Sequence, residues 1–349
     1  MPLVGVDIAP HGVRIVELQP TARGPRISHH AQMPLDAGAW QAALDGDPQP
    51  LAQTLKRTWQ ASGTRQRQAA LALPANAVIT RTLCLPQPAH EEELEMLVEA
   101  DAAQSLPFPR DEISLDFATL GPAENDEGMV DVLLVAARSE RIAQRVGWAE
   151  AAGLKPVVVG VESLAVVAAI ARLCGDARHP EAILHFSGDG THCLFVRGDR
   201  LLFERDIGKP LPALTSGSSD PGGASHREAM HAAELDHWLD AASLEWQRHA
   251  QLFGAAAGDG DIDRIHLVGA GTLGPLLASG LRQRLGIDAG VPDPFLHWPH
   301  AQRQRPSASM RDGGQPVGID AGDLAADDLH ANGACCLLAC GLALRGMPA

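Results

Sequence analysis

The sequence predicts an internally duplicated α/β protein with two lobes and a ligand-binding cleft between them. Two segments carry this prediction, because each consists of two apolar, strand-like runs joined by a short turn of small residues. The first segment has runs at 3–8 and 13–18 around the turn APHG, and the second has runs at 182–186 and 191–196 around SGDG. Stretches with helical spacing follow both hairpins.

Composition excludes several classes of protein. The chain has 349 residues, 45% of them hydrophobic, so it is long enough for one large bilobed domain or for two ordinary ones. The formal net charge of −15 argues against a nucleic acid or an anionic lipid surface as the main partner. The six cysteines form no CxxC pair, which is typical of free thiols in a reducing cytoplasm. We expect neither a signal peptide nor direct membrane insertion, because no apolar run approaches the roughly 20 residues of a membrane-spanning helix.

The first half continues with alternating helices and strands. Helical spacing covers 39–62, and an acidic amphipathic helix is expected over 91–104. Strands are expected at 69–73, 78–85, 113–120, 130–136 and 157–161, the last of them buried. Further helices are expected over 139–153, capped by Ser139 and ended by Gly153, and over 162–173.

The second half has a third strand at 201–206, a long helix over 227–253, a buried strand at 264–269 and a helix over 275–285. The final helix is expected over 333–344, with Cys335, Cys336 and Cys340 as small buried apolar residues. The stretches 214–225 and 299–331 are polar and rich in Gly, Pro or Ser, so we expect exposed loops that are dispensable for folding.

Asp7, at the end of the first strand-like run, is the main chemical candidate. The backbone N–H groups of a turn of small residues can hold phosphate, and a neighbouring carboxylate can reach Mg²⁺ or its waters. The alternative is an ordinary hairpin in which Asp7 is a turn residue.

A second motif, HLVGAGTLG, resembles the glycine pattern of dinucleotide-binding proteins, with Gly269, Gly271 and Gly274 after a strand. That pattern calls for an acid about 20 residues later. Asp288 has this spacing, but we do not expect a strand around it. Close packing of helix on strand also explains the glycines. The chain has no GxSxG, P-loop lysine or HExxH motif, and its histidines lack metal-ligand spacing.

Several segments, in their order and spacing, resemble the PilM family of type IV pilus assembly proteins, relatives of FtsA in the actin-like superfamily. They are GVDIAPHGVRIVEL (5–18), VITRTLCLP (78–86), LPFPRDEISLDF (106–117), VDVLLVAARSERI (130–142), VVVGVESLAV (157–166), RIHLVGAGTLGPL (264–276) and CGLALRG (340–346). The resemblance implies a bilobed actin-like, ribonuclease H-like duplicated fold with an additional small α/β subdomain. The implied division is first lobe 1–77, inserted subdomain 78–155, return and connecting helix 156–180, second lobe 181–332, and C-terminal helix 333–349.

The resemblance also implies a nucleotide site and a partner. Asp7, Pro10, His11 and Gly12 would form the first phosphate loop, with Asp7 as the indirect Mg²⁺ ligand. Gly188 and Asp189 would lie in the second loop, Glu162 beside the cleft, and Gly269, Ala270 and Gly271 at the adenosine. A PilN-like inner-membrane protein would bind through its cytoplasmic N-terminal peptide, together with other pilus platform components.

Two departures from the family pattern bear on function. Phe186 stands where the second loop of the family has an acid, and Pro10, His11 and Gly12 replace a serine-rich run. Lost hydroxyl and carboxylate groups weaken phosphate and Mg²⁺ binding. We therefore expect ATP and Mg²⁺ to bind weakly or not at all, in a non-enzymatic cytoplasmic scaffold recruited to the inner membrane. The alternatives are an active ATPase that drives pilus assembly and an actin-like component of a type II secretion platform.

The partner peptide is expected in a groove between the 78–155 subdomain and the neighbouring lobe. Leu106 and Phe108, which lie between prolines, are the candidate apolar anchors. Alternatively, both are core residues of the subdomain. The sequence leaves the two possibilities open.

Overall fold

Two five-stranded sheets with the same strand order form the centre of the molecule. The structure is a computed structural model that describes residues 2–88, 90–123, 126–175, 179–188, 190–208, 211, 224–257, 262–300 and 333–347. The first sheet has the order β3-β2-β1-β4-β8 and the second has the order β11-β10-β9-β12-β13. In each, three antiparallel strands are followed by two parallel ones, so the internal duplication expected from the two hairpins is present.

The first sheet comprises β1 (Val4–Ala9), β2 (Gly12–Thr21), β3 (Gly24–Pro34), β4 (Gln68–Leu73) and β8 (Lys155–Val161). The β1–β2 register places Ala9 opposite Gly12 and Asp7 opposite Arg14. Alternation along β1 sends Val4, Val6 and Ile8 into one apolar cluster, while Leu3 belongs to a cluster on the other face. Asp7 therefore shares the face of Gly5.

The second sheet comprises β9 (Glu181–Phe186), β10 (Thr191–Arg197), β11 (Arg200–Asp206), β12 (Arg264–Val268) and β13 (Asp288–Gly290). Val268 ends β12 beside His185, so Gly269 and Phe186 leave the sheet at the same edge. This edge carries the β9–β10 turn.

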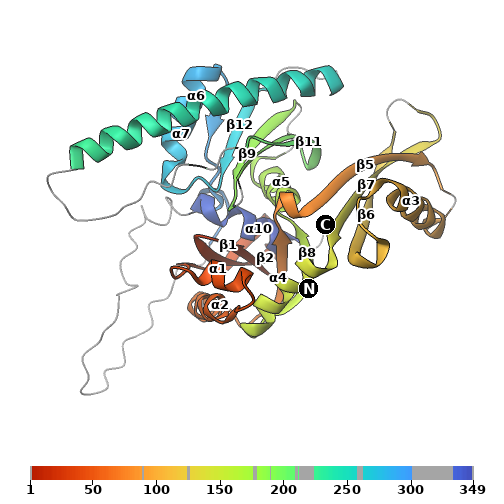
Figure 1. Ribbon diagram of the computed structural model, residues 1–349, viewed down its shortest axis with the longest axis horizontal. Coiled ribbons are helices and arrows are strands. Elements are labelled where there is room, and N and C mark those ends of the chain that lie inside the picture. Colours follow the sequence, from red (N-terminus) through yellow and green to blue (C-terminus); the bar gives the residue numbers. More distant parts are fainter. Residues whose placement is uncertain are drawn as a thin grey trace.

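Two helices, α5 (Glu162–Cys174) and α10 (Leu337–Leu344), lie between the sheets (Figure 1). Their side chains join those of both sheets in one buried cluster. Glycines allow the close approach, because a Cβ on Gly341 would lie 1.9 Å from the carbonyl oxygen of Ala165 in α5. A Cβ on Gly5 would lie equally close, at 1.9 Å, to the carbonyl oxygen of Ala339 in α10.

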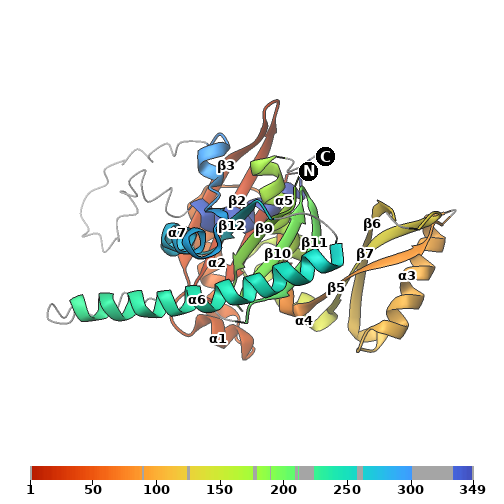
Figure 2. The same ribbon diagram turned by 90° about the horizontal axis from the view of Figure 1, so that it is seen from above.

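Outer helices cover the remaining faces. On the first sheet these are α1 (Ala39–Leu44), α2 (Gln49–Ser62) and α4 (Ser139–Ala151), which share an apolar cluster with β1 and β2. On the second sheet they are α6 (Ala224–Ala257) and α7 (Gly274–Leu285). Trp238, Trp246 and Phe253 anchor α6, which runs past the sheet at its N-terminal end (Figures 1 and 2). A short helix, α8 (Pro294–His297), precedes residue 300.

A third sheet, β5-β7-β6, stands to the side of the other two (Figure 1). It consists of β5 (Val78–Pro86), β6 (Ile113–Pro122) and β7 (Met129–Arg138), and α3 (Glu91–Ser105) covers one face. Leu94, Val98 and Ala102 face the sheet, whereas Leu97 is half-buried. Short 3₁₀ turns lie at Ala75–Ala77, Arg110–Glu112, Gly271–Leu273 and Ala334–Cys336.

Four local expectations were wrong. The helix expected over 39–62 is interrupted between α1 and α2, where Pro48 precedes α2. Ser139 does not cap α4, although its hydroxyl lies 3.1 Å from that of Ser114. The strand at 157–161 is an edge strand with Val157 52% exposed. The segment Asp288–Gly290, for which no strand was expected, pairs with β12 as β13.

The two expected loops lie mostly outside the described residues, as 212–223 and 301–332. Their described ends belong to a helix and to a backbone hydrogen bond. Residues 224 and 225 begin α6, and the carbonyl oxygen of Pro299 accepts a hydrogen bond of 2.9 Å from the backbone N–H of Ile27. Among the described residues, no helix is long and apolar enough to cross a membrane.

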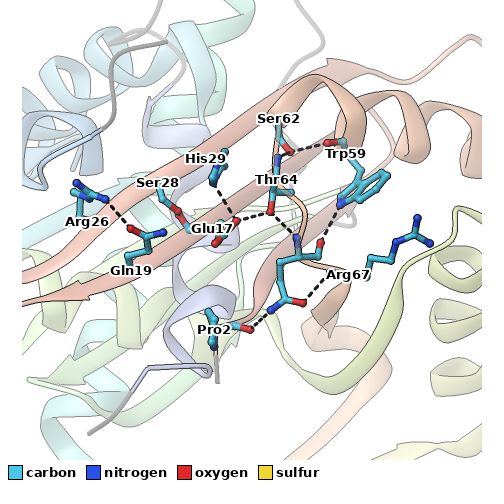
Figure 3. Close-up of polar contacts among 11 residues, drawn as sticks. Pro2, Glu17, Gln19, Arg26, Ser28, His29, Trp59, Ser62, Thr64 and Arg67 are labelled. Carbon is cyan, nitrogen blue, oxygen red and sulfur yellow. Dashed lines mark hydrogen bonds and ion pairs between the residues drawn. The ribbon is translucent and has the colours of Figure 1, made fainter. Parts of the chain in front are cut away.

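A polar network ties the end of α2 to the first sheet (Figure 3). The carboxylate of Glu17, 8% exposed, accepts a hydrogen bond from Thr64 and lies 3.1 Å from Nδ1 of His29. Gln66 links this segment to the N-terminus by donating to the carbonyl oxygen of Pro2 at 2.8 Å. Arg67 follows, with its guanidinium over the ring of Trp59.

Candidate functional site

The main cavity, of about 660 Å³, extends from the two hairpin turns to the β5-β7-β6 sheet. The β1–β2 turn, the β9–β10 turn, α4, the start of α5 and the segment 106–108 all contribute to its lining. Of the predicted site residues, the cavity brings together Asp7, Pro10, His11, Glu162, Gly188, Gly269, Leu106 and Phe108. Gly12, Ala270 and Gly271 are not among the lining residues, and Asp189 lies outside the described residues.

Asp7 is paired with an arginine that the sequence analysis missed. Nη1 of Arg14 lies 2.8 Å from Oδ2 of Asp7, and both side chains are largely buried. Burial alone would lower the pKa of Arg14. The charge of Asp7, the hydrogen bond to it and the neighbouring Cys335 and Cys336 together outweigh burial, so the pKa is raised. The signal was in the sequence, because a hairpin that pairs Ala9 with Gly12 must pair Asp7 with Arg14.

The two turns touch each other. A Cβ on Gly188 would lie 2.2 Å from Cδ of Pro10, so the side chain of Pro10 packs directly on the second turn. A Cβ on Gly269, whose φ is +85°, would lie 2.2 Å from the carbonyl oxygen of Phe186. Phe186 is buried beneath this edge, with its ring 5.6 Å from that of Trp238.

Charge in the cavity favours an anionic ligand. Among the described residues, the lining carries the guanidinium groups of Arg14, Arg138, Arg141 and Arg145 and the carboxylates of Asp7 and Glu162. This is an excess of two positive charges in a chain whose formal net charge is −15. Phosphate groups suit such a lining, whereas Mg²⁺ takes carboxylate and water oxygens. Because Asp7 is already bound to Arg14, the described residues fit the phosphates of a nucleotide better than they fit Mg²⁺.

His11 adds a titratable group to the same turn. Its pKa is lowered, first by partial burial and then by the charge of Arg14, while Asp7 opposes the shift. The imidazole is therefore neutral at pH 7.

At the other end of the cavity, Leu106 and Phe108 differ from each other. Leu106 is half-buried and packs against the cluster beneath α3, as a core residue does. Phe108 is 38% exposed, and the guanidinium of Arg138 lies 5.2 Å from its ring centroid. Phe108 thus presents an accessible aromatic face to the cavity.

The wall between the two ends comes from α4, which sequence patterns did not single out. Arg141, Arg145 and Trp148 line the cavity at helical spacing, so they share one face of α4, and Arg138 lines it just before the helix begins. Arg145 lies against the rings of Trp40 and Trp148, at 5.4 and 5.0 Å from their centroids. These contacts join segments far apart in the sequence.

The cysteines of the last helix divide between core and cavity. Cys336 and Cys340 are buried as expected, and burial raises the pKa of Cys336 to about 12. Cys335 is only half-buried and lines the cavity, contrary to expectation.

The dinucleotide alternative does not fit the geometry. Asp288 pairs with Arg264 at the start of the parallel strands β12 and β13. Gly269 lies at the opposite, carboxyl end of β12, so Asp288 is at the wrong edge to bind a ribose there. The part of the chain that the structure describes also contains no cluster of three or more His, Cys, Asp or Glu residues able to hold a metal ion.

Comparison with known proteins identifies the family. The family model "Type IV pilus assembly protein PilM" matches residues 5–208, more than half of the chain. The chain belongs to the PilM family of type IV pilus assembly proteins. A solved structure described as a PilM–PilN type IV pilus biogenesis complex is 25% identical, with a TM-score of 0.77 over 100% of this chain and 99% of that one.

Two further solved structures match at lower identity. The ethanolamine utilization protein EutJ from Carboxydothermus hydrogenoformans is 14% identical, with a TM-score of 0.43 over 84% of this chain and 85% of its own. A Bacteroides thetaiotaomicron protein with an actin-like ATPase fold is 9% identical, with a TM-score of 0.42 over 83% and 90% of the two chains. The PilM-family member described here has the bilobed, actin-like α/β fold expected from its sequence.

Proposed function

We propose that this chain is a non-enzymatic, actin-like scaffold of the type IV pilus assembly platform. In this role it is cytoplasmic and is recruited to the inner membrane by the N-terminal segment of a PilN-like protein. The full-length similarity to the PilM component of a PilM–PilN complex supports the choice of partner.

One observation carries the non-enzymatic part of the proposal, namely the ion pair between Asp7 and Arg14. A hydrolytic site of this fold needs carboxylates that are free to hold Mg²⁺ and its waters. Here Asp7 is neutralised by Arg14, and Phe186 replaces the acid of the second loop. The contact between Pro10 and Gly188 further narrows the space between the two turns.

In this proposal each end of the cavity has its own ligand. Asp7, Pro10, His11, Gly188 and Gly269 lie at the nucleotide end. ATP binds there weakly through Arg14 and the turn N–H groups, with Gly12, Asp189, Ala270 and Gly271 as further candidates. At the other end, the exposed ring of Phe108 and the neighbouring Leu106 receive an apolar side chain of the partner peptide.

The two ends of the cavity belong to different parts of the proposed domain division. Residues 1–77 and 156–180 form the first lobe, 181–332 form the second, and 333–349 return to the first lobe. The subdomain 78–155 contributes β5, β6, β7 and α3, while its last helix, α4, packs against the first lobe.

The alternative of an active ATPase rests on Glu162, a carboxylate that is 7% exposed and lines the cavity at the start of α5. Such a group can orient an attacking water. Calorimetry with ATP and Mg²⁺, together with a phosphate-release assay, separates the two functions. We expect weak binding without steady turnover. Sub-micromolar affinity with turnover that Asp7→Ala abolishes would overturn the scaffold proposal.

The remaining alternative, a component of a type II secretion platform, is separated by partner choice. We expect a pull-down with an immobilised peptide from the N-terminus of the PilN homologue of the same genome to retain this chain. Retention by the corresponding secretion-platform peptide alone would favour the alternative.

A further inference from the structure

Arg145 connects the wall of the cavity to the first hairpin. Its side chain is largely buried, with the residue 7% exposed, and Nη1 donates a hydrogen bond of 2.8 Å to the carbonyl oxygen of Ile8. The rings of Trp40 and Trp148, themselves in edge-to-face contact at 5.6 Å, flank the guanidinium. Arg145 is thus held by α1, α4 and β1 at the same time.

The same helix reaches the partner end of the cavity. Arg138, the last residue of β7, directly precedes α4, and its guanidinium lies over the exposed ring of Phe108. The helix begins at Ser139, so Arg145 lies six positions further along α4, or about 9 Å along the axis. The contact with Phe108 is thus joined to Arg145 by the first two turns of one helix.

The hydrogen bond of Arg145 ends next to the nucleotide turn. Ile8 is followed by Ala9, Pro10 and His11, and Pro10 packs on Gly188 of the second turn. Any movement of α4 that shifts the Ile8 carbonyl also shifts these residues, because they belong to one tight hairpin.

We propose that Arg145 is a positioning residue that couples the two ends of the cavity, so that the partner peptide and an anionic nucleotide bind with positive cooperativity. The inference rests on the proposed function, because it takes the Phe108 end as the peptide site. Binding of the peptide fixes α4, and Arg145 then holds the β1–β2 turn in its phosphate-binding position. The nucleotide then binds more tightly, because it no longer has to order that turn. Thermodynamic linkage requires that the nucleotide raise the affinity for the peptide by the same factor.

Hydrogen exchange with the peptide alone tests the mechanical part. We expect saturating PilN-like N-terminal peptide to slow exchange of the amides of Ala9, His11 and Gly12 in the wild type. Arg145→Met keeps an apolar stem but removes the donor, so the peptide should still bind while protection of the turn is lost. Arg145→Lys keeps a donor for the Ile8 carbonyl and should retain part of the protection.

Arg67→Met is the matched control. Arg67 also stacks on a tryptophan, with its guanidinium 5.1 Å from the Trp59 centroid. Both residues are drawn in Figure 3. Arg67 also donates to the carbonyl oxygen of Gly153 at 3.4 Å. It lies outside the cavity lining. Loss of an arginine–tryptophan contact there should leave the protection of the turn unchanged.

Calorimetry measures the cooperativity itself. We expect ATP to bind at least fivefold more tightly when the peptide is present, and the factor to fall to one in Arg145→Met. The coupling would be overturned if the peptide binds but does not slow amide exchange in the turn of the wild type, or slows it equally in the wild type and in Arg145→Met. Peptide binding itself would still support the proposed function in that case. A folded wild type that does not bind the peptide would overturn both.

Discussion

Replacing Phe108 by alanine separates a partner-binding residue from a core residue. The ring is 38% exposed, so of the roughly 200 Å² of an aromatic side chain about 75 Å² remains for a ligand to cover. At about 25 cal/mol per Å², covering this area contributes about 1.9 kcal/mol, which corresponds to about a 25-fold change in affinity. We therefore expect Phe108→Ala to weaken binding of the PilN-like peptide more than tenfold.

The same change should cost little folding stability. A fully buried phenylalanine costs about 3–5 kcal/mol when truncated to alanine, and Phe108 is bounded on its free side by solvent and on the other by Arg138. We expect a loss of about 1 kcal/mol in the free energy of unfolding.

Two measurements made together give the answer, namely fluorescence anisotropy of a labelled peptide and urea unfolding. Phe117→Ala is the control, because Phe117 packs against the cluster beneath α3 and does not line the main cavity. It should lower stability more than Phe108→Ala does and leave peptide affinity unchanged. A Phe108→Ala variant that loses 3 kcal/mol or more, or a stable variant that binds like the wild type, would refute the assignment.

Three further outcomes are expected. Arg14→Met leaves the carboxylate of Asp7, which is 6% exposed, without its ion pair and should lower the free energy of unfolding, measured with urea, by about 3 kcal/mol. The double variant Asp7→Asn/Arg14→Gln removes both charges and should lose less. An anion bound beside His11 raises the lowered pKa of its imidazole, so ATP binding should take up protons and should strengthen as the pH falls from about 7.5 to 5.5. Calorimetric titration in buffers of different ionisation enthalpy measures this proton uptake, and His11→Asn should abolish it. Gly341→Ala forces α10 away from α5 and should lower the free energy of unfolding by about 2 kcal/mol or more. Gly147→Ala places its methyl group with nothing within 4 Å and should stabilise α4 by up to about 1 kcal/mol. Equal melting temperatures for the two variants would contradict this expectation.

Local patterns predicted the strands well. Both hairpins, β4, β5 and the β6–β7 pair follow from alternation of apolar residues and from small turn residues, which act within a few positions along the chain. The break at Pro48 was also readable, because proline disfavours a helical conformation in the residue before it. The expectation of one long helix gave too much weight to the spacing of the tryptophans and leucines.

The candidate site was predictable only in part. Asp7 lies near the end of β1, and His11 and Gly188 lie in the short turns that the sequence predicts; the cavity includes all three. Arg145 escaped detection because its contact with Ile8 spans 137 positions and depends on how α4 docks on the first sheet. The exposure of Phe108 could not be predicted either, since aromatic residues flanked by prolines occur both in cores and on surfaces. Only the placement of β7 and Arg138 shows that Phe108 lies on the surface.

The ion pair between Asp7 and Arg14 supplies an internal counter-charge for a buried carboxylate in the wall of the cavity. A bare carboxylate at the floor of a cleft would make the folded state depend on the supply of metal and nucleotide in the cell. With the guanidinium in place, we expect the yield of folded chain to be the same in starved and in growing cells.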